Sequence, residues 1–125
     1  MTTKERLLRY REIERMIVTI GDEREEIRTA CVYDEGAIRE ADRKIAALAA
    51  EKAQIRAWIE KLPDGVEKRL IIYRYVCDLP WKLVEYKIAY GRRQTVRLHN
   101  KALAMLDHYR LPTRINQDMG TDGTS

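Results

Sequence analysis

The residues best suited to a specific chemistry lie in one short stretch near the end of the chain, at positions 92–101. Hydrogen-bond donors dominate the stretch, namely Arg92, Arg93, Gln94, Thr95, Arg97, Asn100 and Lys101. Arginine can donate two hydrogen bonds to the O6/N7 edge of guanine, glutamine can pair with adenine in the same way, and valine can contact a thymine methyl group. Such residue types on one helix favour direct reading of DNA bases.

The helical period divides this stretch into two faces. The inward face holds Thr95, Leu98, Ala102 and Leu106, and the opposite face holds Arg93, Val96, Arg97, Asn100 and Ala104. We predict base contacts from Arg92, Arg93, Gln94, Val96, Arg97 and Asn100. We predict phosphate contacts from Lys82, Lys87, Thr95 and Lys101. His99 lies nearer the inward face, where we expect it to pack or bond locally, with a phosphate contact as the alternative. The alternative for the charged face is ordinary solvation.

Three helices must position these side chains. Pro63 ends the preceding helix, since proline disfavours helical backbone in the residue before it, and a helix over 65–77 follows. Pro80 permits a helix that begins at 80 or 81 and runs to 88. A tight turn at Ala89-Tyr90-Gly91 then leads into a helix over 92–108. A short helix, a three-residue turn with glycine and a longer helix are typical of the helix-turn-helix motif.

The first half of the chain predicts a helical hairpin. A helix over 3–32, with Thr2 or Thr3 and Glu5 as its cap and a kink or break at Gly21, is followed by a turn at 33–36 in which Asp34 caps the next helix. The helix over 37–61 has an apolar heptad seam at Ile38, Ala41, Ile45, Leu48, Ile55, Ile59 and Leu62, with Lys52 in the same register. Lys52 either specifies the partner or extends to solvent. We expect the hairpin to join two copies along this seam.

The positive charge is gathered in the second half of the chain. Residues 1–62 hold 13 Lys/Arg and 13 Asp/Glu, residues 63–111 hold 10 and 5, and residues 112–125 hold 1 and 2, so the net charges are 0, +5 and −1. A local basic excess predicts a polyanionic partner. We therefore predict an all-α protein with an oligomerising hairpin at 1–62, a helix-turn-helix domain at 63–111 and a flexible tail at 112–125.

The sequence gives little support for a metal site, a disulfide or a membrane-spanning segment. Cys31 and Cys77 fit no metal or disulfide spacing and are expected to be buried or half-buried thiols. His99 and His108 are too few for a metal cluster, and we predict neither metal nor cofactor. The apolar runs are too short for a membrane span, and the first 15 residues lack an apolar signal core.

Enzymatic function is also not expected. No nucleophile lies in a recognisable pattern with a base, and the acidic residues near Glu23, Glu25 and Glu26 belong to a mixed-charge helix surface. We predict that the chain is not an enzyme.

The second half also carries a family resemblance. The Arg74-Tyr75 pair, Trp81 after a short linker, the stretch AYGRRQTVRLH and Lys101-Ala102-Leu103 make residues 62–106 resemble region four of sigma-70-type factors, which reads the promoter −35 element. With the hairpin in front, residues 5–106 are similar to small phage and prophage regulators of the ArpU and RinA type. Gly91 stands where a capping serine is usual, and Val84-Glu85 where Ile-Ala is usual.

The resemblance implies a transcriptional regulator of phage origin that binds double-stranded DNA as a homodimer in the cytoplasm of a bacterial host cell. It implies RNA polymerase as a further partner. One alternative is a small terminase subunit, a DNA-packaging adaptor that combines similar elements in a ring. Another is a protein-binding module whose hairpin captures a partner helix and which does not bind DNA.

Overall fold

The structure is a computed structural model that describes residues 1–31 and 33–109, and every regular element in these ranges is helical. This confirms the all-α fold class. The elements are α1 (Thr3–Thr29), α2 (Glu35–Glu60), α3 (Val66–Ile71), η1 (Ile72–Val76), α4 (Trp81–Ile88) and α5 (Arg92–Asp107). The tail that we expected to be flexible, 112–125, lies outside the described residues.

The two long helices begin at the expected side-chain caps. The Thr2 hydroxyl accepts a hydrogen bond from the Glu5 backbone N–H at 3.1 Å, and the Thr2 N–H donates to the Glu5 carboxylate at 2.8 Å. The Asp34 carboxylate accepts from the Ala37 N–H at 3.1 Å. The break expected at Gly21 is wrong, because α1 continues through it to Thr29. The packing of α1 along α2 outweighs the low helix propensity of one glycine.

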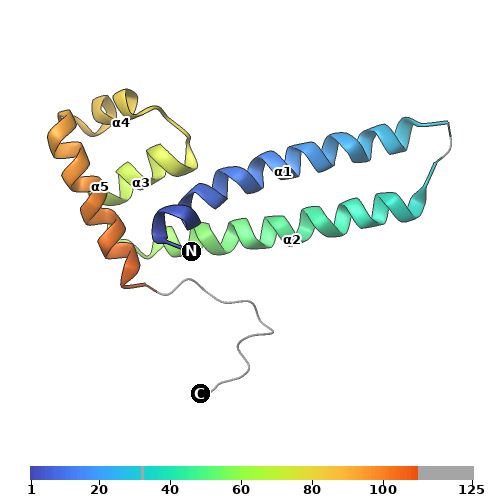
Figure 1. Cartoon of the computed structure of the whole chain (residues 1–125), viewed down its shortest axis with the longest axis horizontal. Helices are drawn as coiled ribbons and strands as arrows, with labels where there is room; N and C mark the ends of the chain where they lie inside the picture. The colour runs from blue at the N-terminus through green and yellow to red at the C-terminus, as the bar shows by residue number, and fades with distance from the viewer. Residues whose placement is uncertain (32, 110–125) are drawn as a thin grey trace, which may run out of the picture.

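α1 and α2 form an antiparallel hairpin that extends to one side, while α3, α4 and α5 gather at its other end (Figure 1). The heptad seam of α2 packs inside this hairpin rather than against a second copy. Its members are buried or half-buried within one chain, namely Ile38, Ala41, Ile45, Leu48, Ile55, Ile59 and Leu62. Because most of the seam is covered within one chain by α1 and by the three-helix end, it leaves little apolar surface for the predicted contact with a second copy.

Lys52, the charged residue in the same seam register, also makes its contacts within the chain. Its ammonium lies 3.4 Å from the Glu14 carboxylate of α1 and 5.6 Å from the centre of the Tyr10 ring. The charge at this seam position is thus paired within the hairpin. Its side chain is one-third exposed.

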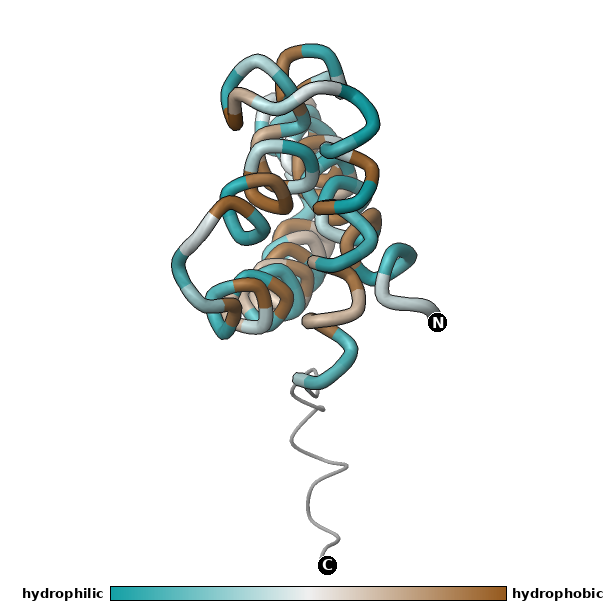
Figure 2. The backbone as a smooth tube through the Cα atoms, turned by 90° about the vertical axis from the view of Figure 1, so that its left-hand side faces the viewer, coloured by the Kyte–Doolittle hydropathy of each residue, from teal (hydrophilic) through white to brown (hydrophobic). Residues whose placement is uncertain are grey.

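One hydrophobic core joins the hairpin to the three-helix end. Leu7 and Ile13 of α1 and Ile59 of α2 are fully buried in the same cluster as Leu70 of α3 and Leu106 of α5. Figure 2 views this end, where hydrophobic and hydrophilic positions alternate along each helix. The boundary drawn at residue 62 therefore does not separate two cores.

Polar contacts reinforce the same junction. The Trp58 indole N–H of α2 donates to the backbone oxygen atoms of Leu106 and Tyr109 at 3.3 and 2.9 Å. In a molecule of this size, such a buried tryptophan contributes apolar packing and a satisfied donor together. The hairpin end and α5 consequently hold a defined orientation.

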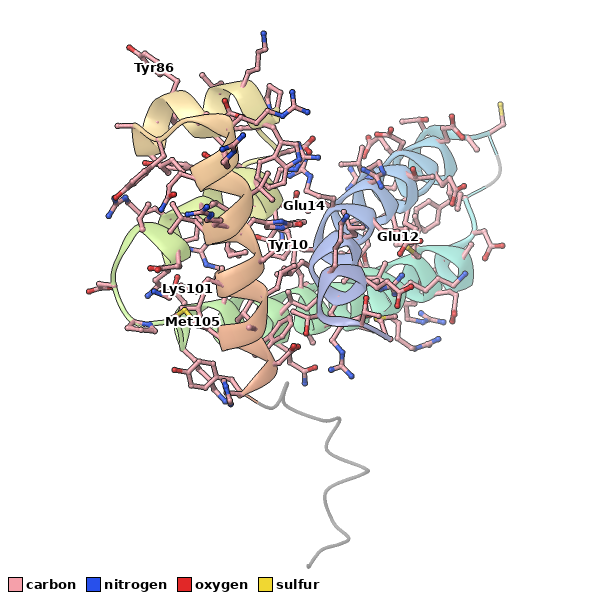
Figure 3. All side chains as sticks on the ribbon, turned by 60° about the vertical axis from the view of Figure 1, so that its left-hand side comes forward. Tyr10, Glu12, Glu14, Tyr86, Lys101 and Met105 are labelled. Carbon is pink, nitrogen blue, oxygen red and sulfur yellow. The ribbon has the colours of Figure 1, made fainter. Side chains whose placement is uncertain are left out.

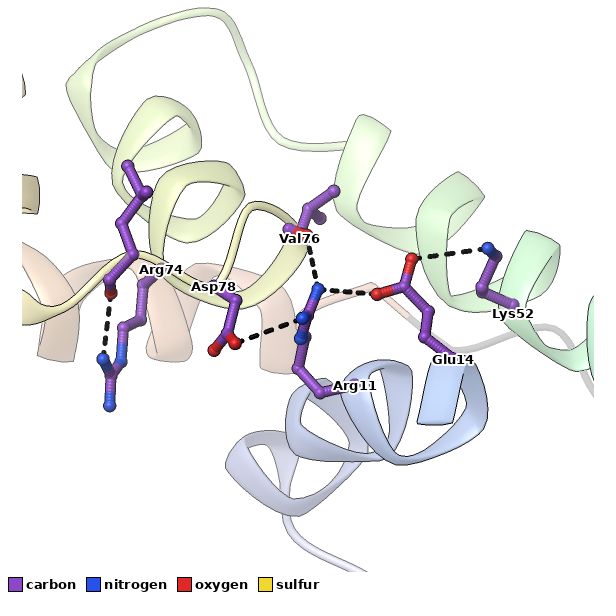
Figure 4. Close-up of polar contacts among 7 residues, drawn as sticks. Arg11, Glu14, Lys52, Arg74, Val76 and Asp78 are labelled. Carbon is purple, nitrogen blue, oxygen red and sulfur yellow. Dashed lines mark hydrogen bonds and ion pairs between the residues drawn. The ribbon is translucent and has the colours of Figure 1, made fainter. Parts of the chain in front are cut away.

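An arginine of α1 links the hairpin to the segment after η1 (Figure 4). The Arg11 guanidinium donates to the Val76 carbonyl at 3.1 Å, to the Asp78 carboxylate at 3.1 Å and to the Glu14 carboxylate at 2.6 Å. Glu14 in turn pairs with Lys52 of α2. This network connects three segments, so the position of α1 against the helix-turn-helix is specified by polar contacts as well as by the core.

Candidate nucleic-acid interface

The helix-turn-helix expected from the sequence is present at α4 and α5. Residues 89–91 connect the two helices, and the left-handed residue of the turn is Ala89, with φ 64° and ψ 38°. Gly91 is extended, with φ −76° and ψ 175°, and a side chain there would meet nothing within 4 Å. The turn therefore does not need its glycine for backbone freedom, while the alanine is held in a region that costs an L-residue about 1–2 kcal/mol.

The predicted base-reading residues all lie on the exposed side of α5. The six predicted residues are each exposed, namely Arg92, Arg93, Gln94, Val96, Arg97 and Asn100. Val96 is 52% exposed although it is apolar, while Leu98, Ala102 and Leu106 on the opposite face are buried. The outward direction of Arg93 and Arg97 agrees with the helical period. The structure thus presents one continuous donor-rich surface.

Thr95 corrects the predicted set of phosphate contacts. Its side chain is 1% exposed, and its hydroxyl lies 3.5 Å from the Tyr90 carbonyl. Thr95 packs inside the helix-turn-helix because it shares the face of Leu98 and Ala102. This burial argues against the predicted role of Thr95 as a phosphate contact.

The three predicted lysine contacts lie in different surroundings. Lys82 lines a groove between α4 and α5. Lys87 is not one of the residues that line this groove, and its ammonium lies 5.8 Å from the centre of the Tyr73 ring. Lys101, labelled in Figure 3, pairs with the Glu67 carboxylate at 3.1 Å. A phosphate at Lys101 would compete with this carboxylate, so the structure favours Lys82 of the three.

The groove beside Lys82 has an aromatic wall. Trp81 and His99 meet edge to face with ring centres 4.8 Å apart, and the Arg74 guanidinium lies 4.7 Å from the centre of the Trp81 ring. The Tyr75 hydroxyl is 2.7 Å from the Nε2 atom of His99. The expectation that His99 bonds locally is therefore confirmed. These contacts fix the orientation of α4 against α5.

Burial shifts the pKa values of two side chains beside this groove, His99 and Tyr75. Desolvation lowers the pKa of His99 below its ordinary value, and the positive charges of Lys4 and Arg74 lower it further. Desolvation also raises the pKa of Tyr75. At pH 7 the His99 ring is consequently neutral in the free protein.

Lys4 is the groove residue that sequence reasoning missed. It belongs to the first turn of α1 and lines the groove together with Lys82, Arg92 and Val96. No local pattern around position 4 distinguishes it from the other charged residues of the hairpin. Only the packing of α1 against the helix-turn-helix brings it to this face.

Positive charge on this surface is not neutralised locally. Lys82, Arg92, Arg93 and Arg97 form no ion pair with any carboxylate in the described part of the chain. Neither α4 nor α5 has a side-chain cap, so their first backbone N–H groups are open to an anion. The surface thus offers both charge and hydrogen-bond donors.

Three further features concern the cysteines, metal binding and membrane-spanning helices. Cys31 and Cys77 are free and exposed, so the expectation of buried or half-buried thiols is wrong. Across residues 1–31 and 33–109, no three His, Cys, Asp or Glu side chains are grouped to hold a metal ion. No helix in these same ranges combines the length and apolar character of a membrane span.

Comparison with protein-family models, with curated proteins and with solved structures finds no match to this chain. The interpretation of the site therefore depends on its own geometry and charge.

Proposed function

We propose that this chain is a sequence-specific DNA-binding protein that inserts α5 into the major groove of double-stranded DNA. Arg93, Arg97 and Asn100 contact base edges, while Lys82 contacts a backbone phosphate. A recognition helix that follows a short helix and a tight turn enters the groove with its N-terminal residues foremost. This arrangement matches the position of the exposed donors at the start of α5.

One observation carries the proposal. Lys82, Arg92, Arg93 and Arg97 are exposed and have no described carboxylate partner, whereas Lys101 on the flank of α5 is already paired with Glu67. A solvated helix surface commonly mixes both signs of charge, as the hairpin does. A surface with an excess of unpaired positive charge, next to open helix starts, suits the phosphates and guanine edges of DNA.

The biological role that we propose is transcriptional regulation of the phage type, in the cytoplasm of a bacterial host, with RNA polymerase as a further partner. This role rests on the resemblance to sigma region four. The homodimer remains part of the proposal, but its contact surface must differ from the α2 seam, which is used within the chain. Sedimentation tests this point, since twice the chain mass supports the dimer and a large closed multiple supports the packaging adaptor.

Selection of bound duplexes from a random DNA pool tests the DNA-reading assignment. The wild-type chain should enrich a defined motif. Arg93→Ala and Arg97→Ala should each weaken binding to that motif by about 1–3 kcal/mol and relax the base preference at one position. Arg43→Ala, on the exposed surface of α2, is the matched control and should leave the motif unchanged.

Two results would contradict the proposal. The first is a wild-type chain that enriches no motif, which would favour the protein-binding module. The second is enrichment of the same motif by Arg93→Ala and Arg97→Ala with wild-type affinity, which would remove α5 as the reading element.

A further inference from the structure

The start of the hairpin reaches the face that we assign to DNA. Leu7 of α1 is fully buried in the shared core, and the Thr3 hydroxyl donates to the Asp107 carboxylate at the end of α5. Between these two anchors, Lys4 extends to the groove that Trp81 and His99 border. The position of Lys4 is thus set by tertiary packing on both sides of it.

The groove beside Lys4 has a surplus of positive charge. It encloses about 480 Å³, and its charged lining consists of Lys4, Lys82, Arg92 and Glu85. With His99 neutral, three positive charges and one negative charge leave a net charge of +2. Lys4, like Lys82 and Arg92, forms no ion pair with a described carboxylate. A phosphodiester group, which carries one negative charge, suits the sign of this lining.

The groove is continuous with the base-reading surface. Arg92 and Val96 line the groove and are also members of the exposed donor-rich side of α5. A duplex whose major groove holds α5 therefore brings the backbone of one strand towards the α4 side. Lys4 lies there together with Lys82, although 78 positions separate the two residues in the sequence.

We propose that Lys4 binds a backbone phosphate of the DNA, so that the first turn of the hairpin forms part of the DNA interface. This inference rests on the proposed function and adds a residue from outside the helix-turn-helix to it. Lys4 contributes affinity without sequence information, because a phosphate contact is the same for every base pair. The hairpin then serves as a support that carries a cation to the edge of the groove.

His99 provides an internal reporter for the position of Lys4. The groups that face its ring are Tyr75 and Arg74 from η1, Lys4 from α1, and Lys82, Glu85 and Arg92 in the groove lining. Because the positive charge of Lys4 helps to lower the pKa of His99, Lys4→Ala should raise that pKa in the free protein. A nuclear magnetic resonance titration of the His99 ring measures this without DNA.

The main experiment measures the affinity of the full chain for two duplexes over a range of salt concentrations. One duplex carries the motif selected from the random pool, and the other has an unrelated sequence. Each phosphate contact adds about 0.9 to the slope of log K against log salt. Lys4→Ala should therefore flatten the slope by about 0.9 on both duplexes, while Lys4→Arg should keep it. Lys44→Ala, an exposed lysine of α2, should also keep it.

The outcomes separate this inference from the proposed function. A wild-type slope for Lys4→Ala, together with an altered motif for Arg93→Ala, would overturn the Lys4 contact and leave the DNA-reading helix in place. An unchanged His99 pKa in Lys4→Ala would also overturn it, since Lys4 would then not lie beside the groove. A wild-type chain whose DNA binding does not depend on salt would end both proposals.

Discussion

The hairpin and the helix-turn-helix end differ in how many of their Lys and Arg side chains pair with a carboxylate. In residues 1–62, eight of the 13 Lys and Arg side chains pair with a carboxylate, as Arg9 does with Glu51 and Arg24 with Asp42. In residues 63–109, two of nine do so, namely Lys68 and Lys101. Exposed ion pairs contribute little stability. The difference therefore concerns which charges remain available to a polyanion rather than how the fold is held together.

The helix starts show the same contrast. α1 and α2 begin with side-chain caps at Thr2 and Asp34, whereas α3, α4 and α5 begin without one. The two described non-glycine residues with positive φ, Asp78 and Ala89, also lie in the second region. The hairpin helices cap their first N–H groups, and the helix-turn-helix end leaves helix-start donors uncapped and holds the strained backbone. Departures of this kind from local optimum are expected where a surface serves a ligand.

The largest effect is expected from the core that joins the two regions. Leu7→Ala should lower the free energy of unfolding by about 2–5 kcal/mol, because Leu7 is fully buried between α1 and the three-helix end. Denaturant unfolding followed by circular dichroism and by tryptophan fluorescence should give coincident curves. Leu8→Ala, at a neighbouring side chain that is 46% exposed, should change stability by less than about 0.5 kcal/mol. Separate transitions would show that the two regions unfold independently.

The strained turn should give a smaller, stabilising effect. Ala89→Gly relieves the left-handed backbone of Ala89 and should raise the free energy of unfolding by up to about 1 kcal/mol. Thermal or denaturant unfolding measures the gain. The corresponding change in the hairpin, Ala47→Gly in the middle of α2, should instead destabilise by about 1 kcal/mol. If both substitutions destabilise equally, glycine relieves no strain at Ala89, and the turn does not differ from the hairpin in this respect.

The lysines of α4 test the charge comparison within one helix. Lys82→Ala should flatten the salt slope of DNA binding by about 0.9, because Lys82 lines the groove. Lys87→Ala should change the slope much less, since Lys87 lies against Tyr73 away from that groove. If both variants flatten the slope equally, the DNA backbone covers the whole of α4. Tyr86 lies between Lys82 and Lys87 in the sequence. Its side chain projects away from the molecule (Figure 3).

The smallest effect is expected from a paired cation of the hairpin. Arg24→Ala removes the partly exposed contact between the Arg24 guanidinium and the Asp42 carboxylate, which lie 2.6 Å apart. It should cost about 0–1 kcal/mol of stability and should leave the DNA salt slope unchanged. A slope that falls as it does for Lys82→Ala would extend the DNA interface along the hairpin and remove the contrast between the two regions.

Much of the fold and part of the candidate site follow from local rules. Thr2 and Asp34 mark helix starts because a short side-chain oxygen can satisfy a free backbone N–H. Arg93 and Arg97 face outward because they alternate with Leu98 and Ala102 at the helical period. These features depend on residues within a turn or two of one another, so the chain itself determines them.

Tertiary structure alone decided the rest. Periodicity shows that Ile55 and Ile59 must be covered, but not whether α1 or a second copy covers them. Position 4 has no distinguishing pattern, and its place beside His99 follows from the packing of Leu7 into a core shared with α5. Local sequence determines which face of a helix is apolar, because the helical period is a property of the backbone. The neighbour of that face is determined by contacts between distant segments, which become favourable only when the whole core forms.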